Sequence, residues 1–143
     1  MKKVRAGCIP YYIFDSTVFM LFMIPSDPKY GGDKPQIAKG AVEEHETDFK
    51  EAAIREAEEE LGLIKSNTFD VFKTYAHIQP TKTGVSEFYV FACKILTKEN
   101  FIDPHFETKE TVWLNEYQIK ENIRRDQQFL VYNSIRKIKQ KEN

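Results

Sequence analysis

The sequence predicts an α+β fold, an α/β/α sandwich in which helices cover both sides of a mixed β-sheet. Two strand-like segments begin the chain, one long helical segment lies near its middle, and further strands precede a helical end. Helices and strands in this order pack around one sheet. A length of 143 residues and a hydrophobic content of 41% suit one domain over residues 1–143 with a single sizeable core.

The first two strands are expected at residues 4–14 and 17–24, where Val, Ile, Phe and Tyr are frequent. Asp15 and Ser16 between them are typical of a turn, so the strands would form a hairpin. Residues 25–35 contain three prolines and two glycines, which indicates a loop long enough to lie over a site. A short extended segment then leads to Gly40.

The clearest helix spans residues 47–61, which contain neither Gly nor Pro. Asp48 followed by Glu51 resembles a capping box at its start, with Thr47 as an alternative cap. Gly62 is well placed to end the helix. Apolar residues recur every four positions and form one packing stripe. These residues are Phe49, Ala53, Ala57 and Leu61.

The second half of the chain predicts more strands and a helical end. Strands are expected at residues 69–78 and 87–95, around a turn at 80–84, and a short strand at 111–114. From Asn115 onward, apolar residues recur at near-helical spacing among charged ones, which predicts one or two amphipathic helices. These apolar residues are Ile119, Ile123, Leu130, Ile135 and Ile138.

The charges are balanced overall but unevenly placed. Lysine and arginine total 21 against 22 acidic residues, which gives no sign of a protein that coats nucleic acid or a membrane. Residues 40–63 contain nine acidic and two basic side chains, whereas residues 117–143 contain seven basic and three acidic ones. The acidic segment coincides with the predicted central helix.

The two cysteines, Cys8 and Cys93, are too few for a disulfide scaffold or a zinc site, so reduced, buried thiols are expected. The longest apolar run, residues 18–25, is too short to cross a bilayer, which needs about 20 residues. Residues 6–8 (Ala-Gly-Cys) faintly resemble a lipoprotein cleavage site, but no apolar segment precedes them, so export is not expected. We therefore expect a cytoplasmic protein without a membrane partner.

Three glutamates lie on one face of the predicted helix. Glu56, Glu59 and Glu60 stand at positions i, i+3 and i+4, so their side chains can converge. Their mutual repulsion would be relieved by a hard divalent cation such as Mg²⁺, which prefers oxygen ligands. A solvated, glutamate-rich face is the alternative that the helix alone leaves open.

A wider pattern includes these glutamates. Gly40, Glu46 and residues 55–63 (Arg-Glu-Ala-Glu-Glu-Glu-Leu-Gly-Leu) resemble the Nudix box, and every fixed position in its second half matches. The family pattern places seven residues between the glutamate and the arginine, whereas eight separate Glu46 from Arg55. We expect a one-residue insertion at the start of the helix. The strands and the final helix also resemble the Nudix arrangement over nearly the whole chain.

The resemblance implies a metal site and its ligands. Glu56, Glu59 and Glu60 would hold one to three Mg²⁺ or Mn²⁺ ions, with the carbonyl of Gly40 as a further ligand, and Arg55 would orient a glutamate. Glu56, Glu59 and Arg55 would accordingly be catalytic. Metal ions neutralise the oxygens of a pyrophosphate, stabilise the leaving phosphate and lower the pKa of the attacking water.

Two further residues are candidates through the same resemblance. Lys39 is similar to a lysine that many family members use to contact phosphate, and an ordinary exposed lysine is the alternative. The base that activates water would be a box glutamate or one from a later loop, where Glu107 is favoured over Glu110. Surface charge is the alternative interpretation of both later glutamates.

The remaining polar and aromatic candidates are weaker. The histidines show no metal-ligand spacing, and no Ser or Cys belongs to a recognisable triad. Aromatic residues in or near the strands could stack on a base, although such residues more often belong to a core. The histidines are His45, His77 and His105, and the aromatic residues are Tyr11, Tyr30, Tyr75 and Phe88.

The resemblance implies hydrolysis of the pyrophosphate bond in a nucleoside diphosphate derivative. The Lys39–Gly40 pair at the start of the box resembles the same position in diadenosine polyphosphate hydrolases, although Ala38 stands where those enzymes usually have proline. Pro80 lies where ADP-ribose hydrolases often carry a proline, and its turn explains it equally well. Both substrates therefore stay open.

Other functions within the resemblance are less favoured. An RNA 5′-pyrophosphohydrolase would use the basic segment 117–143, and a nucleoside triphosphate pyrophosphatase is a further alternative. A non-catalytic, nucleotide-sensing Nudix module would tend to lose the box glutamates, which are all present here. The expected partner is a nucleotide, and the sequence leaves a homodimer open.

Overall fold

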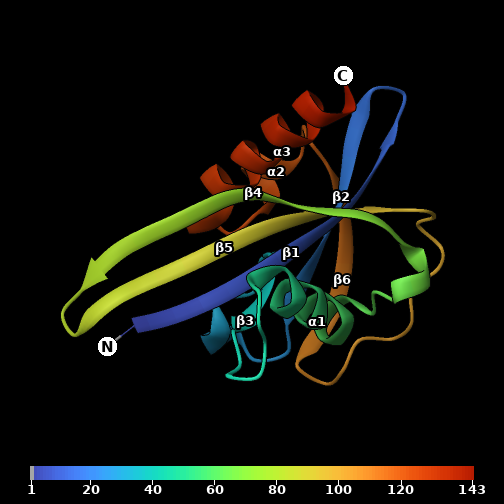
Figure 1. Ribbon diagram of the computed structural model, residues 1–143. Coiled ribbons are helices and arrows are strands. Elements are labelled where there is room, and N and C mark those ends of the chain that lie inside the picture. The colour runs from blue at the N-terminus through green and yellow to red at the C-terminus, as the bar shows by residue number, and fades with distance from the viewer. Residues whose placement is uncertain (1) are drawn as a thin grey trace.

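The computed structural model describes residues 2–143, and its centre is a six-stranded sheet in the order β4-β5-β1-β2-β6, with β3 paired to β1 (Figure 1). The β1–β5 pair is parallel and the other pairs are antiparallel, so the sheet is mixed. The strands are β1 (Lys2–Phe14), β2 (Thr17–Pro25), β3 (Ala38–Ala41), β4 (Thr68–Thr81), β5 (Gly84–Ile95) and β6 (Thr108–Asn115).

Strand β1 is shared by two partners along the same edge. Its first half pairs with β3, where Arg5 stands opposite Ala41, and its second half pairs with β2, where Tyr11 stands opposite Met20. The sheet therefore forks at β1. The short strand β3 and the helix α1 (Phe49–Leu61) lie together in the opening of this fork.

Helices cover both faces of the sheet (Figure 1). On one face α1 buries Ala53, Ala57 and Leu61 against the strands, as the four-residue stripe predicts. On the other face α3 (Gln128–Glu142) buries a second apolar stripe. The short helix α2 (Ile119–Asn122) and three 3-10 turns complete the chain. The predicted α+β sandwich around a mixed sheet is confirmed.

The ends of α1 follow local signals in the sequence. The side chain of Asp48 accepts a hydrogen bond from the backbone N of Glu51 at 2.7 Å, so Asp48 is the cap and the alternative, Thr47, is not. Gly62 ends the helix in a left-handed conformation with φ of 76°. The helix therefore begins two residues later than predicted and ends where predicted.

Several strands are longer than the sequence predicts. The predicted turn at residues 80–84 is wrong in extent, because β4 continues to Thr81 and β5 begins at Gly84. Pro80 is tolerated in β4 because this strand lies at the edge of the sheet, where a missing N–H breaks no ladder. The strand predicted at 111–114 extends to Thr108–Asn115.

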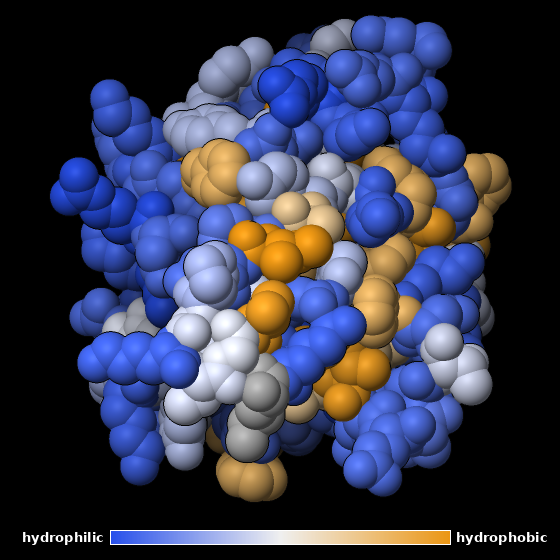
Figure 2. All heavy atoms as spheres, turned by 60° about the vertical axis from the view of Figure 1, so that its left-hand side comes forward, coloured by the Kyte–Doolittle hydropathy of each residue, from blue (hydrophilic) through white to orange (hydrophobic). Residues whose placement is uncertain are grey.

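The cysteines, the helices and one face of the surface complete the description of the fold. Cys8 and Cys93 are both buried and free, which confirms the predicted reduced thiols. None of the helices within residues 2–143 is long and apolar enough to cross a lipid bilayer. Figure 2 shows apolar side chains gathered between hydrophilic ones on the face that looks out from the β4–β5 side.

Candidate active site

A glutamate of α1 packs directly onto a glycine of β3. Glu56 is 6% exposed, and a Cβ atom added at Gly40 would lie 2.1 Å from its Oε2 atom. Any side chain at position 40 would thus push the carboxylate away. The contact brings the acidic face of α1 against the backbone of β3.

Arg55 holds three glutamates and joins α1 to β3. Its Nε and Nη2 atoms donate to Glu46 Oε2 and Oε1 at 2.8 and 3.0 Å, and its Nη1 donates to Glu56 Oε2 at 2.8 Å. Nη1 also lies 3.5 Å from Glu59 Oε1, and Nη2 donates to the carbonyl of Ala41 at 2.9 Å. Glu46 therefore reaches Arg55 although the loop before the helix is one residue longer than the family pattern.

The same arginine pairs with two glutamates of the acidic loop before α1. Within residues 2–143, only Glu43, His45 and Glu46 bring three metal-ligand atoms within 4.8 Å of one another. Arg55 Nε lies 3.3 Å from Glu43 and 2.8 Å from Glu46, so two of the three residues are already paired with a cation. The hydrogen bonds from Arg55 and from the backbone N–H of Glu43 keep the pKa of Glu46 below its ordinary value.

Glu60 on α1 lacks an ion-pair partner among residues 2–143, and its neighbour Glu56 shares Arg55 with Glu46. Burial raises the pKa of Glu60 to about 8, and the nearby Glu56 raises it further in the same direction. Burial also raises the pKa of Glu56, although Arg55 opposes this shift. The backbone N of Lys39 donates to Glu60 Oε1 at 3.2 Å. A bound cation would offset the burial of Glu60 and the repulsion from Glu56 that raise its pKa.

The donor set fits Mg²⁺ or Mn²⁺. Mg²⁺ is usually held by one or two carboxylates, while waters and substrate phosphates complete its six ligands. Glu60 and its neighbour Glu56 would supply carboxylates, and the cavity that Glu60 and Gly40 line leaves room for the other ligands. Within residues 2–143, Glu56, Glu59 and Glu60 do not bring three carboxylate oxygens within 4.8 Å of one another, so Glu59 would have to turn from Arg55 to join them on a cation.

The loop after β5 docks on the end of α1. The last carbonyls of a helix have no partner within the helix. Here donors from residues 102–108 satisfy them, and Gly62 is required because a Cβ there would lie 1.8 Å from the carbonyl oxygen of Ile102. The bonds join Ile102 N to Gly62 O at 2.9 Å, His105 N to Glu59 O at 2.9 Å and Thr108 Oγ1 to Glu60 O at 2.8 Å.

This docked loop places a histidine between two acidic candidates. His105 Nδ1 accepts from the backbone N of Glu107 at 3.2 Å, while its Nε2 lies 3.9 Å from Glu59 Oε2 and 3.8 Å from Glu107 Oε1. The spacing of the histidines did not predict a role for His105, because its position depends on the docking of the loop. Glu107 lines the adjacent cavity, whereas Glu110 is exposed on β6 and is not among the described residues that line it.

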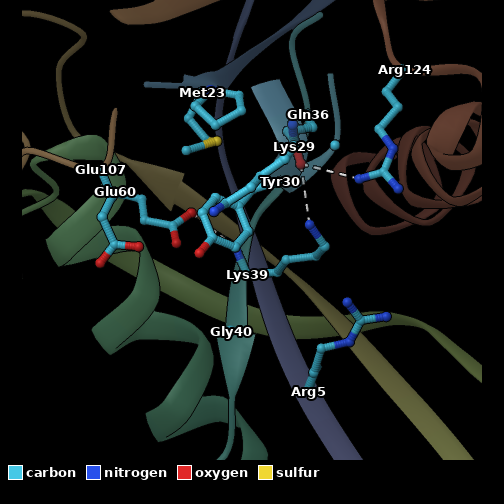
Figure 3. A pocket seen from close by; sticks show the side chains of 12 residues that line it. Arg5, Met23, Lys29, Tyr30, Gln36, Lys39, Gly40, Glu60, Glu107 and Arg124 are labelled. Carbon is cyan, nitrogen blue, oxygen red and sulfur yellow. Dashed lines mark hydrogen bonds between the residues drawn. The ribbon is translucent and has the colours of Figure 1, made fainter. Parts of the chain in front are cut away.

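The cavity has an acidic wall and a basic wall. It measures about 360 Å³. Figure 3 shows Glu60 and Glu107 on one side, and the nitrogen-bearing ends of Arg5, Lys39 and Arg124 on the other. A multiply anionic ligand that also binds a cation would match both walls.

Lys39 is a half-buried member of the basic wall, in contrast to an ordinary surface lysine. Its Nζ donates to Gln36 Oε1 at 3.2 Å. Burial lowers its pKa to about 8, and the nearby Arg124 and Arg5 lower it in the same direction. An anion beside Lys39 would offset these effects and stabilise its charged form.

Sequence reasoning missed Arg5, Gln36 and Arg124. They come from β1, from the bridge that follows the proline-rich loop, and from the segment between α2 and α3. A weak signal existed for Arg5, the one arginine in an otherwise largely apolar strand. Of the aromatic candidates, Tyr30 lines the cavity, while Tyr11 is fully buried in the core.

Solved structures share this fold at low sequence identity. The NUDIX domain of Shewanella oneidensis NrtR, solved with ADP ribose, matches with a TM-score of 0.77 and 8% identity over 96% of this chain and 89% of that chain. An Ap4A hydrolase of C. elegans matches at 0.63 and 22%, over 82% and 84%. A NUDIX hydrolase from Nitrosomonas europaea matches at 0.61 and 14%, over 85% and 78%.

The family is shown by a match between the sequence and a family model. No curated protein matches it closely enough to count as a relative. The model of the NUDIX domain, however, matches residues 2–132, which is most of the chain. The protein therefore belongs to the NUDIX domain family.

Proposed function

We propose that this enzyme hydrolyses the pyrophosphate bond of a nucleoside diphosphate derivative, of the ADP-ribose or diadenosine polyphosphate type, with Mg²⁺ or Mn²⁺. The observation that carries the proposal is the cavity with opposed walls, where Glu60 faces Lys39 and the two arginines. Two structures of similar fold support these substrates: one is a NUDIX domain solved with ADP ribose, and the other is an Ap4A hydrolase.

The metal would be held by Glu56, Glu59, Glu60 and the carbonyl of Gly40. When bound, the ion supplies charge neutralisation at the phosphate oxygens and a lower pKa for the attacking water. The raised pKa values of Glu56 and Glu60 support this assignment, because a divalent cation would relieve the repulsion between them.

The protein's own groups then have distinct tasks. Arg55 orients Glu56 through the hydrogen bond at 2.8 Å. Lys39 binds a phosphate oxygen with its ammonium group. Glu107, on the docked loop, accepts the proton of the water that attacks phosphorus, while the bridging P–O bond breaks and its electron pair leaves with the departing phosphate.

The test is a panel of ADP-ribose, diadenosine polyphosphates, reduced dinucleotides, nucleoside triphosphates and 5′-triphosphate RNA, with and without Mg²⁺ or Mn²⁺. Glu59→Gln should lower metal-dependent turnover by at least about 100-fold, a typical effect of losing an acid–base or ligand group. Glu58→Gln is the matched control, because Glu58 lines a different hollow with Lys65 and should keep wild-type turnover.

Two outcomes would overturn the proposal. Binding of a nucleotide without turnover by the wild type, even with metal, would indicate a nucleotide-sensing module. Turnover of RNA or of nucleoside triphosphates alone would keep the chemistry and replace the substrate class.

A further inference from the structure

Three cations lie between two cavities. Arg5, Lys39 and Arg124 line the cavity that holds Glu60, and they also line a second cavity of about 290 Å³. Phe88 and His77 also line the second cavity. A ligand that extends from the carboxylates into the second cavity must pass these three cations.

One buried amide holds two of the cations in place. Gln36 Oε1 accepts hydrogen bonds from Lys39 Nζ and Arg124 Nη1, both at 3.2 Å (Figure 3). Its backbone is anchored by two hydrogen bonds to Met23, and the residue is 1% exposed. Gln36 is thus a rigid positioning residue for the basic wall.

Two buried donors at this wall have no acceptor. The amide oxygen of Gln36 must face the two cations, which turns its NH₂ group away from them. Within residues 2–143, neither Gln36 Nε2 nor Arg5 Nε has a hydrogen-bond partner. Because buried polar groups are nearly always paired, both atoms point to a missing acceptor.

The cations also outnumber their counter-charges. Arg124 Nε pairs with Asp126 at 2.6 Å, and Arg5 lies over the ring of Phe88 at 5.5 Å. No carboxylate within residues 2–143 forms an ion pair with the side chain of Arg5 or of Lys39. These unpaired positive charges would be stabilised by an anionic group of the ligand, in addition to the phosphates that a metal ion at the acidic wall would bind.

The proline-rich loop is shaped around the arginine. Gly31 adopts φ of 115°, and a Cβ atom there would lie 2.5 Å from Arg124 Nη1 and 2.8 Å from the amide of Gln36. Any other residue would displace the pair. The loop, β3 and the α2–α3 link therefore converge on one position of the cavity.

We propose that Arg5, Lys39 and Arg124, with the free amide donor of Gln36, bind a phosphate group beyond the scissile pyrophosphate, so that the preferred substrate carries at least three consecutive phosphates. The inference rests on the proposed function and narrows it. ADP-ribose has two phosphates followed by a neutral ribose, and it would leave this position without an anion. A diadenosine polyphosphate fills it and extends a nucleoside toward the second cavity.

The kinetic test uses diadenosine di-, tri- and tetraphosphate, which differ only in the number of phosphates. For the wild type, kcat/KM should be at least about tenfold higher for the tetraphosphate than for the diphosphate, as expected for added charge-assisted hydrogen bonds. In Arg124→Gln this ratio should fall toward one, and Arg124→Lys should restore part of it. Arg125→Gln is the matched control, because the neighbouring Arg125 lines a separate hollow and should keep the ratio.

A binding test makes the result independent of turnover. Calorimetry with inorganic tripolyphosphate, without metal, should show binding to the wild type that weakens at least about tenfold in Arg5→Gln and in Arg124→Gln. Equal kcat/KM values for the diphosphate and the tetraphosphate, or equal tripolyphosphate affinities in all variants, would overturn the inference. Tripolyphosphate binding without hydrolysis of any substrate would instead overturn the proposed function alone.

Discussion

Arg55 and Glu46 form a two-point ion pair, in which Nε and Nη2 of the arginine donate to the two carboxylate oxygens at 2.8 and 3.0 Å. The Glu46 side chain is 1% exposed and that of Arg55 is 22% exposed. Such paired hydrogen bonds hold both groups in one geometry. The position of Arg55, and through it that of Glu56, thus depends on a glutamate outside the helix.

Glu46→Gln is expected to lower the free energy of unfolding by about 1.5–3 kcal/mol at pH 7, the usual contribution of a hydrogen bond to a charged group. Urea unfolding measures the loss. Glu44→Gln, at an exposed position two residues earlier, should change stability little.

The same pair predicts a dependence on pH. Because Arg55 keeps the folded-state pKa of Glu46 below its ordinary value of 4.5, the pair stabilises the fold fully above that pH. The stability difference between the wild type and Glu46→Gln should therefore shrink as pH falls below 4.5. A difference that stays constant from pH 7 to pH 3 would contradict this assignment.

Gly40→Ala is expected to destabilise the protein by about 1–3 kcal/mol through overpacking against Glu56. The added Cβ would lie 2.1 Å from the carboxylate, so removal of that carboxylate should remove most of the penalty. A double-mutant cycle with Glu56→Ala measures the coupling. Equal costs of Gly40→Ala in the two backgrounds would show that the clash is with something else.

Mn²⁺ affinity is expected to rise with pH. Burial raises the pKa of Glu60 to about 8, which favours the protonated carboxyl at neutral pH, and a Glu60 that binds a cation would release this proton. Below this pKa, affinity should increase by about tenfold per pH unit, and it should level off above it. Calorimetric titrations at several pH values test this, and Glu60→Gln should bind weakly with a flat profile.

Glu107→Gln is expected to lower kcat by about 10²–10⁴, the usual effect of losing a general base, because Glu107 lines the cavity on the docked loop. Glu110→Gln makes the same substitution on exposed β6 and should keep kcat near the wild-type value. Steady-state kinetics with the best substrate compares the two. A loss confined to Glu110→Gln would reverse the assignment.

The parts that sequence reasoning predicted correctly depend on local spacing. The helix α1, its cap at Asp48 and its end at Gly62 follow from signals within a few residues of each other. The helical repeat likewise places Glu56 and Glu60 on one face without knowledge of the fold. Neighbouring residues sufficed because a helix makes its hydrogen bonds within a few positions.

The parts that sequence reasoning missed depend on contacts between distant segments. Arg5 reaches the site because β1 pairs with β3, and Arg124 reaches it because its backbone N donates to the carbonyl of Pro35 at 3.0 Å. His105 is positioned by its bond to the end of α1. Spacing along the chain carries no information about such pairings, so a single sequence could not reveal them.

The loop that docks on the end of α1 also determines how easily the site is lost. If the loop separates from the helix, the residues that it positions leave the site. Its donors, from Ile102 to Thr108, all end on the last turn of the helix, where the amides of Gly62 and Leu63 make their own hydrogen bonds to Glu58 and Ala57. These amides should exchange with deuterium as one cooperative unit, faster than those of the central sheet. Heating would then open this unit first and inactivate the enzyme while the sheet is still folded.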